Sequence, residues 1–132
     1  MGSKQKGFPA IKIISVFVIL GILAVGAVPN HMVVQNSARV KAAGGQIAEV
    51  KGRLRTALSG YMLSNNGAQP ATAAALVAYA NNITTNTCPA AATAEGDFNF
   101  LCSTAGTVVT ITVNSVQGVS LAPAATGNYT LQ

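Results

Sequence analysis

The chain has 132 residues, of which half are hydrophobic and only 8% are charged. This composition excludes a disordered chain and is unusually poor in charge for a soluble enzyme. The net charge of +5 comes without an aromatic surface for base stacking, so it does not favour nucleic acid as a primary partner. The length leaves room for one membrane or assembly helix and one small globular domain.

The N-terminal segment joins a short basic leader to a long apolar run. Residues 1–7 read MGSKQKG and are too short to fold. The run from Ile13 to Val28 has no charged residue, and as a helix it spans about 24 Å, slightly less than a hydrocarbon core. Lys12 lies at its start, where its side chain can reach toward the membrane interface. Pro29 removes a helical hydrogen bond at the far end, so a kink or break is expected there.

A second helical pattern follows the apolar run. Its apolar residues recur at spacings of three and four and form one stripe: Val40, Ala43, Ile47, Val50, Leu54, Ala57 or Leu58, and Tyr61. Glu49 and Arg53 are an i,i+4 pair in the favourable orientation. Asn65-Asn66-Gly67 supplies a left-handed stop, so the helix should end near Ser64.

The remaining chain predicts a short helix and then strands. Pro70 suits the first turn of a helix over residues 71–80 that ends around Asn81. The strand candidates are Asp97–Leu101, Thr107–Val113, Gly118–Leu121 and Asn128–Leu131, the last two separated by Pro123 and Gly127. Because a sheet of this size cannot bury a core alone, its apolar face should lie on the C-terminal half of the long helix. The predicted fold class is α+β, with three or four antiparallel strands.

Few residues of this chain could carry chemistry. The even cysteine count in a domain this small points to one disulfide between Cys88 and Cys102, if the domain is exported. Glu95 and Asp97 could be two calcium ligands, although two carboxylates alone make a poor site and an exposed turn is the simpler interpretation. The two cysteines and the distant His31 do not make a metal-ligand set, and no cofactor is expected. Too few titratable groups can converge for catalysis, so we expect no enzyme.

The order of these parts, with Gly7-Phe8, Gly21 and Pro29 spaced as they are, resembles a type IV pilin or a type II secretion pseudopilin. The resemblance implies that a prepilin peptidase cuts after Gly7 and that Phe8 is then N-methylated. It also implies three parts: a leader (1–7), a transmembrane or filament-core helix (8–29) and a pilin-like globular domain (30–132) that includes the amphipathic half of the long helix. The resemblance is specific over about the first thirty residues, and beyond them it rests on the order of elements.

Two positions depart from the family pattern. Pro9 stands where the family usually has threonine, and proline is harmless in a first helical turn. Lys12 stands where the family nearly always has a glutamate, which is thought to neutralise the amino terminus of a neighbouring subunit. An unpaired lysine in an apolar filament core would be costly. Three explanations stay open: Lys12 reaches lipid headgroups and later finds another partner, the subunit sits at a filament tip, or the position was altered from a native glutamate.

The implied function is structural. The resemblance implies a subunit that polymerises through the Phe8–Pro29 helix, with copies of itself, the prepilin peptidase and an assembly platform as partners. The precursor would lie in the bacterial inner membrane and then enter an extracellular pilus (fimbrium) or, as the alternative, a periplasmic pseudopilus of a type II secretion system. A different class is also open. Residues 1–12 could be the basic part of an ordinary secretory signal, with cleavage near Ala27 releasing a soluble exported domain.

Overall fold

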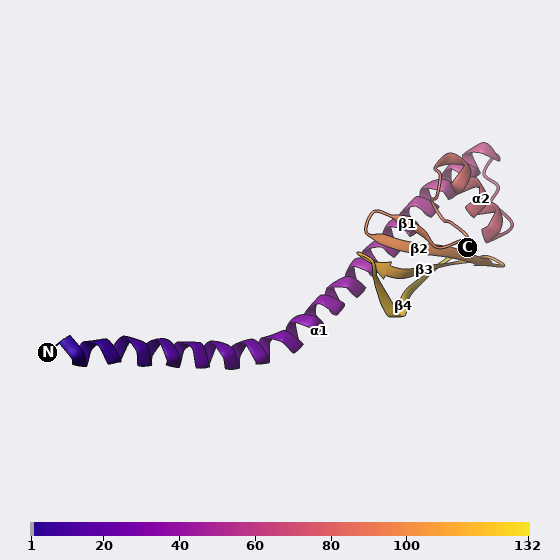
Figure 1. Cartoon of the computed structure of the whole chain (residues 1–132). Coiled ribbons are helices and arrows are strands. Elements are labelled where there is room, and N and C mark those ends of the chain that lie inside the picture. The colour runs from indigo at the N-terminus through magenta and orange to yellow at the C-terminus, as the bar shows by residue number, and fades with distance from the viewer. Residues whose placement is uncertain (1) are drawn as a thin grey trace. The chain divides into compact units, whose positions relative to one another are not determined.

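The computed structural model describes residues 2–132, including the side chains of residues 10–23 and 32–132 (Figure 1). A long helix and a short helix precede four strands: α1 (Gly2–Ser64), α2 (Ala73–Ile83), β1 (Thr93–Glu95), β2 (Phe98–Ala105), β3 (Val108–Val116) and β4 (Val119–Thr130). The fold class is therefore α+β, as predicted. The chain divides into two compact units, one that ends at Ala38 and one from Arg39 to Gln132.

The first unit consists of the N-terminal part of α1. The helix already begins at Gly2, so the prediction that the leader is too short to fold is wrong for residues 2–7. Its serine, lysines and glutamine are tolerated or favoured in helices, and they extend an existing helix without a new nucleation step. The helix also continues through Pro29, so of the expected kink or break the break is absent. The side chains of Phe8 and Pro29 lie outside the described residues.

The described side chains of the first unit are exposed. All of residues 10–23 are exposed, and the large apolar side chains from Ile11 to Leu23 have exposed fractions of 53% to 69%. The Ser15 hydroxyl donates to the carbonyl of Ile11 at 2.9 Å, so this polar group is satisfied within the helix. Among the described residues, no helix contains an apolar stretch long enough to cross a membrane. The predicted segment 8–29 lies partly outside the residues whose side chains are described.

The second unit begins with the amphipathic half of α1. Five residues of the predicted stripe are buried in the core: Ala43, Ile47, Val50, Leu54 and Ala57. Val40, at one end of the stripe, is 48% exposed, and Tyr61, at the other end, is half-buried. The helix ends at Ser64, where Asn66 and Gly67 have positive φ angles and the Gly67 amide donates to the Met62 carbonyl at 2.7 Å. The predicted stripe and helix end are thus confirmed, except at the two outer positions of the stripe.

Helix α2 begins later than the sequence pattern predicts. Thr72 is its N-cap, and the Thr72 hydroxyl accepts a hydrogen bond from the Ala75 amide at 3.2 Å. Pro70 therefore precedes the helix and is not in its first turn. The helix then runs to Ile83, two residues beyond the expected end, and buries Ala73, Leu76 and Ala80.

The four strands form one antiparallel sheet in the order β1-β2-β3-β4 (Figure 1). The short strand β1 was not predicted, because three residues carry no recognisable alternation. Strand β4 replaces two predicted strands, so the separation expected at Pro123 and Gly127 is wrong. Proline is tolerated because β4 is an edge strand and the register with β3 shifts between Val113 and Ser115, beside Pro123.

The core lies between one face of the sheet and the two helices. Alternate residues of β2 and β3 are buried with the helix stripe: Phe100, Cys102, Val109, Ile111 and Val113. This packing confirms the predicted position of the sheet on the C-terminal half of α1. Strand β4 approaches the helix most closely at Gly127, where an added Cβ would overlap Cγ2 of Ile47. Gly127 is therefore a site of close packing, not a strand boundary.

Candidate functional site

The residues expected to act in processing and assembly belong to the first unit. Lys12 is exposed on α1, and an added Cβ at Gly21 would have no neighbouring atom within 4 Å. The side-chain environments of Phe8 and Pro29, and with them the surroundings of the Gly7–Phe8 junction, lie outside the described residues. What the structure does describe is an apolar helical surface, from Ile11 to Leu23, in which Lys12 is the charged side chain.

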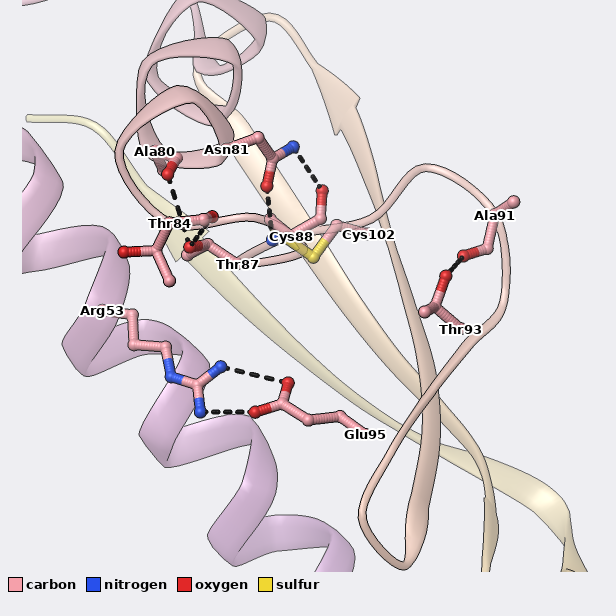
Figure 2. The surroundings of a disulfide bond; sticks show 10 residues. All are labelled: Arg53, Ala80, Asn81, Thr84, Thr87, Cys88, Ala91, Thr93, Glu95 and Cys102. Atoms are coloured by element: carbon pink, nitrogen blue, oxygen red, sulfur yellow. Dashed lines mark hydrogen bonds and ion pairs between the residues drawn. A yellow bond between two sulfur atoms is a disulfide. The ribbon is translucent and has the colours of Figure 1, made fainter.

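The predicted disulfide is present. Cys88 and Cys102 are bonded with their Cα atoms 5.4 Å apart, and both residues are buried (Figure 2). Cys102 lies in β2, and its amide donates to the carbonyl of Pro89 at 2.6 Å. The bond therefore ties the segment after α2 to the sheet.

Two polar side chains hold the segment that leads to Cys88. The Asn81 amide side chain makes two hydrogen bonds with the Cys88 backbone, donating to its carbonyl at 3.0 Å and accepting from its N–H at 2.9 Å (Figure 2). The Thr87 hydroxyl is buried and donates to the Thr84 carbonyl at 2.8 Å. The Asn81 bonds satisfy the backbone N–H and carbonyl of Cys88 in the segment after α2, and the Thr87 hydroxyl adds a second bond to a carbonyl that the Thr87 amide also contacts.

At the β1 edge of the sheet, Arg53 of α1 joins two carboxylates. Its Nη2 lies 2.6 Å from Oε1 of Glu95 in β1, and its Nη1 lies 3.1 Å from Oε2 of the same residue (Figure 2). Nη2 also contacts Oε1 of Glu49 at 2.5 Å. The hydrogen bonds to Glu95 raise the pKa of Arg53, with a smaller contribution from Glu49, against the opposing effect of partial burial. The guanidinium therefore stays protonated in all but strong alkali, and this contribution to folded-state stability is present throughout the neutral range.

Of the two calcium candidates, Asp97 lies in an exposed turn, as the simpler interpretation expects, whereas Glu95 lies in β1. Both carboxylate oxygens of Glu95 bind Arg53, so a cation there would have to displace an ion pair. Asp97 is exposed in the turn between β1 and β2, where its main-chain carbonyl accepts from the Gln117 amide at 2.6 Å. Within the part of the chain that the structure describes, no three acidic, histidine or cysteine side chains gather into a possible metal site.

At the opposite edge, a polar pocket lies between α1 and β4. It has a volume of about 360 Å³ and is lined by Lys51, Arg55, Leu58, Gln69, Asn128, Tyr129, Thr130 and Gln132. We refer to it as the β4-edge pocket. Sequence reasoning treated its two cations only as part of a solvated helix face. The available signal was their i,i+4 spacing, a like-charge pair that is unfavourable by itself.

Comparison of the chain with models of known protein families, with curated proteins and with solved structures gives no match.

Proposed function

We propose that this protein is the structural subunit of a type IV pilus-like filament. The observation that carries the proposal is the exposed apolar surface from Ile11 to Leu23. Residues 10–23 cover almost four helical turns and are exposed throughout, so the helix is apolar around most of its circumference. A helix of this kind needs cover from lipid or from other protein chains, because so large an apolar surface is unfavourable in water.

The short basic segment and the Gly7-Phe8 junction before this surface support processing by a prepilin peptidase. In the proposal, the Phe8–Pro29 helix anchors the precursor in the bacterial inner membrane before assembly. After cleavage and methylation of Phe8, the helix leaves the lipid and packs against the same helix of neighbouring copies. Lipid and filament core are similarly apolar, so packing and the work of an assembly platform drive this exchange more than transfer free energy does.

The second unit suits a subunit that must stay folded outside the membrane. Among the residues whose burial the structure describes, all core residues lie between Ala43 and Leu131, and the disulfide lies among them. This unit can therefore form the outer layer of a filament while the first unit forms its core. A head-to-tail contact that does not close on itself produces an open helical assembly.

Two measurements on the protein from its native host test the proposal. The mass of the mature N-terminal peptide should correspond to a methylated Phe8, and electron microscopy of sheared cell-surface material should show thin fibres containing the chain. Fibres confined to the periplasm would instead support a secretion pseudopilus. A mature N-terminus near Val28, together with a purely monomeric soluble product, would show that the chain is an exported domain and that the filament proposal is wrong.

Lys12 offers a further test of assembly. If its charge opposes entry into an apolar filament core, Lys12→Glu should increase the fraction of methylated Phe8 and the yield of fibres. Lys12→Gln is the matched control, because it removes the positive charge without supplying a carboxylate, and we expect an intermediate gain. Equal behaviour of all three proteins would contradict the charge argument and leave snorkelling or a position at the filament tip as explanations.

A further inference from the structure

The β4-edge pocket contains two cations whose charge is not neutralised by a neighbouring side chain. Lys51 and Arg55 are one turn apart on α1, and both line the pocket. Neither makes an ion pair or a side-chain hydrogen bond with any described residue. The two cations repel each other, and because no described side chain neutralises them they give the pocket a local excess of positive charge.

The acidic residues of the chain lie elsewhere. Glu49 and Glu95 are both bound to Arg53 at the β1 edge. Asp97 follows β1 directly, in the turn between β1 and β2 at the same end of the strand order. The sheet order β1-β2-β3-β4 places these acids and the pocket at opposite edges.

The position of Lys51 is defined by close packing against the edge strand. A Cβ at Gly127 would lie 3.4 Å from Cε and 3.5 Å from Nζ of Lys51. The ammonium group therefore lies over the β4 backbone, in the space that the missing side chain leaves. Lys51 is half-buried, so its charge is less screened than that of a fully exposed lysine.

The α-carboxylate of Gln132 also belongs to the lining but makes no ion pair with Lys51 or Arg55, and the other polar groups of the pocket are neutral donors and acceptors. Gln69, Asn128 and Gln132 bring amides, and Thr130 brings a hydroxyl. Groups of this kind bind hydroxyls, and the two cations bind an anion. We propose that the β4-edge pocket is a binding site for a phosphate monoester group, with Lys51 and Arg55 binding its oxygens and the amides binding neighbouring hydroxyls.

The charge of the ligand follows from the charge of the pocket. A phosphate monoester carries a charge of about −1.5 to −2 at neutral pH, so both Lys51 and Arg55 attract it. Its three terminal oxygens can contact two donors that lie one helical turn apart, about 5–6 Å between their Cβ atoms. The phosphate can be free in solution or esterified to a sugar, and the chemistry on the pocket side is the same.

The site can be tested by nuclear magnetic resonance on the full chain, in a polyoxyethylene detergent that has no sugar headgroup. Inorganic phosphate, glucose 6-phosphate and glucose are titrated separately at constant ionic strength set with sodium chloride. The amides of Asn128 and Thr130 should shift and saturate with the two phosphates, with a dissociation constant on the order of 1 mM. Tighter binding of glucose 6-phosphate would support a sugar ester as the ligand, and equal binding would show that the pocket binds the phosphate group alone and that its amides do not contact the sugar.

Three variants separate a site from a general charge effect. Lys51→Gln and Arg55→Gln should each weaken phosphate binding about tenfold, because each removes a charge-assisted hydrogen bond. Lys41→Gln is the matched control, since Lys41 is an exposed cation of the same helix that does not line the pocket. Binding in this control should stay within about twofold of the unaltered chain.

Two results would overturn the proposal: shifts that fail to saturate with either phosphate, or an equal loss of binding in Lys41→Gln. The proposal does not depend on filament assembly. A mature N-terminus near Val28 would remove the filament function and leave this site intact.

Discussion

At the β1 edge of the sheet, Arg53 of α1 is bonded to Glu49 and Glu95, whereas at the β4 edge Lys51 and Arg55 of the same helix face no carboxylate among the described side chains. Each helical residue is rotated by about 100° from the previous one, so residues two positions apart point to opposite flanks. Arg53 therefore lies on one side of the core-facing stripe, and its two basic neighbours lie on the other.

The two edges also differ in how the chain is held there. The β1 edge follows the segment bonded through Cys88 and Cys102, and an ion pair joins it to the helix. The β4 edge is held by close packing of Gly127 against Ile47 and has a polar pocket beside it. One helix thus binds carboxylates through Arg53 on one flank and carries Lys51 and Arg55, without an ion pair to any described residue, on the other.

The largest expected effect concerns the disulfide on the β1 side. Cys88→Ser with Cys102→Ser should lower the free energy of unfolding by about 3 kcal/mol, because it releases a loop of about 15 residues in the unfolded chain. Urea unfolding of the full chain in detergent, followed by tyrosine fluorescence, measures this change. Hydrogen exchange should accelerate first in β1 and the adjoining part of β2. Equal acceleration in β3 and β4 would contradict the asymmetry of the two edges.

The next effect concerns close packing on the β4 side. Gly127→Ala should destabilise the protein by about 2 kcal/mol, because the new methyl group overlaps Cγ2 of Ile47 and the strand must move away. Gly45→Ala is the matched control. Gly45 lies in α1 with open space around it, so this substitution should raise the free energy of unfolding by about 0.5–1 kcal/mol. The same urea measurement compares the two, and a stabilising Gly127→Ala would show that β4 is not in close contact with α1.

The smallest effects should have opposite signs at the two edges. Arg53→Gln should lower the free energy of unfolding by about 1 kcal/mol, because it removes the bidentate ion pair with Glu95. The effect is small because this pair is partly exposed and therefore screened by solvent. Arg55→Gln should stabilise by about 0.2–0.5 kcal/mol, because it relieves repulsion with Lys51. Both differences should shrink in high salt. Destabilisation of similar size by both variants would mean that the β4-edge cations are paired in solution.

Much of this architecture follows from local patterns. The apolar residues of α1 recur at helical spacing, so they predict which face of the helix is packed. Asn65-Asn66-Gly67 is a left-handed stop signal, so it predicts where the helix ends. The β-branched run from Thr107 to Val113 likewise predicts a central strand. These features depend on neighbouring residues, which a sequence displays directly.

Other features depend on residues far apart in the chain. Strand β1 has only three residues and owes its existence to pairing with β2. Pro123 and Gly127 resemble strand breakers, yet an edge position and a close helix contact accommodate them within β4. Sequence reasoning paired Arg53 with Glu49 and missed Glu95, which lies 42 residues away.

The sequence alone determined the parts of this protein: a basic N-terminal segment that ends in Gly7-Phe8, an apolar helix with Lys12 at its start, an amphipathic helix, a cysteine pair and a β-rich end. Hydrophobic period and residue chemistry specify these parts because each is a property of a short stretch of chain. Only the tertiary structure decided that Arg53 also binds Glu95 while Lys51 and Arg55 remain together beside β4. That distribution depends on which sheet edge lies on which flank of the helix, and this is set by packing between distant segments.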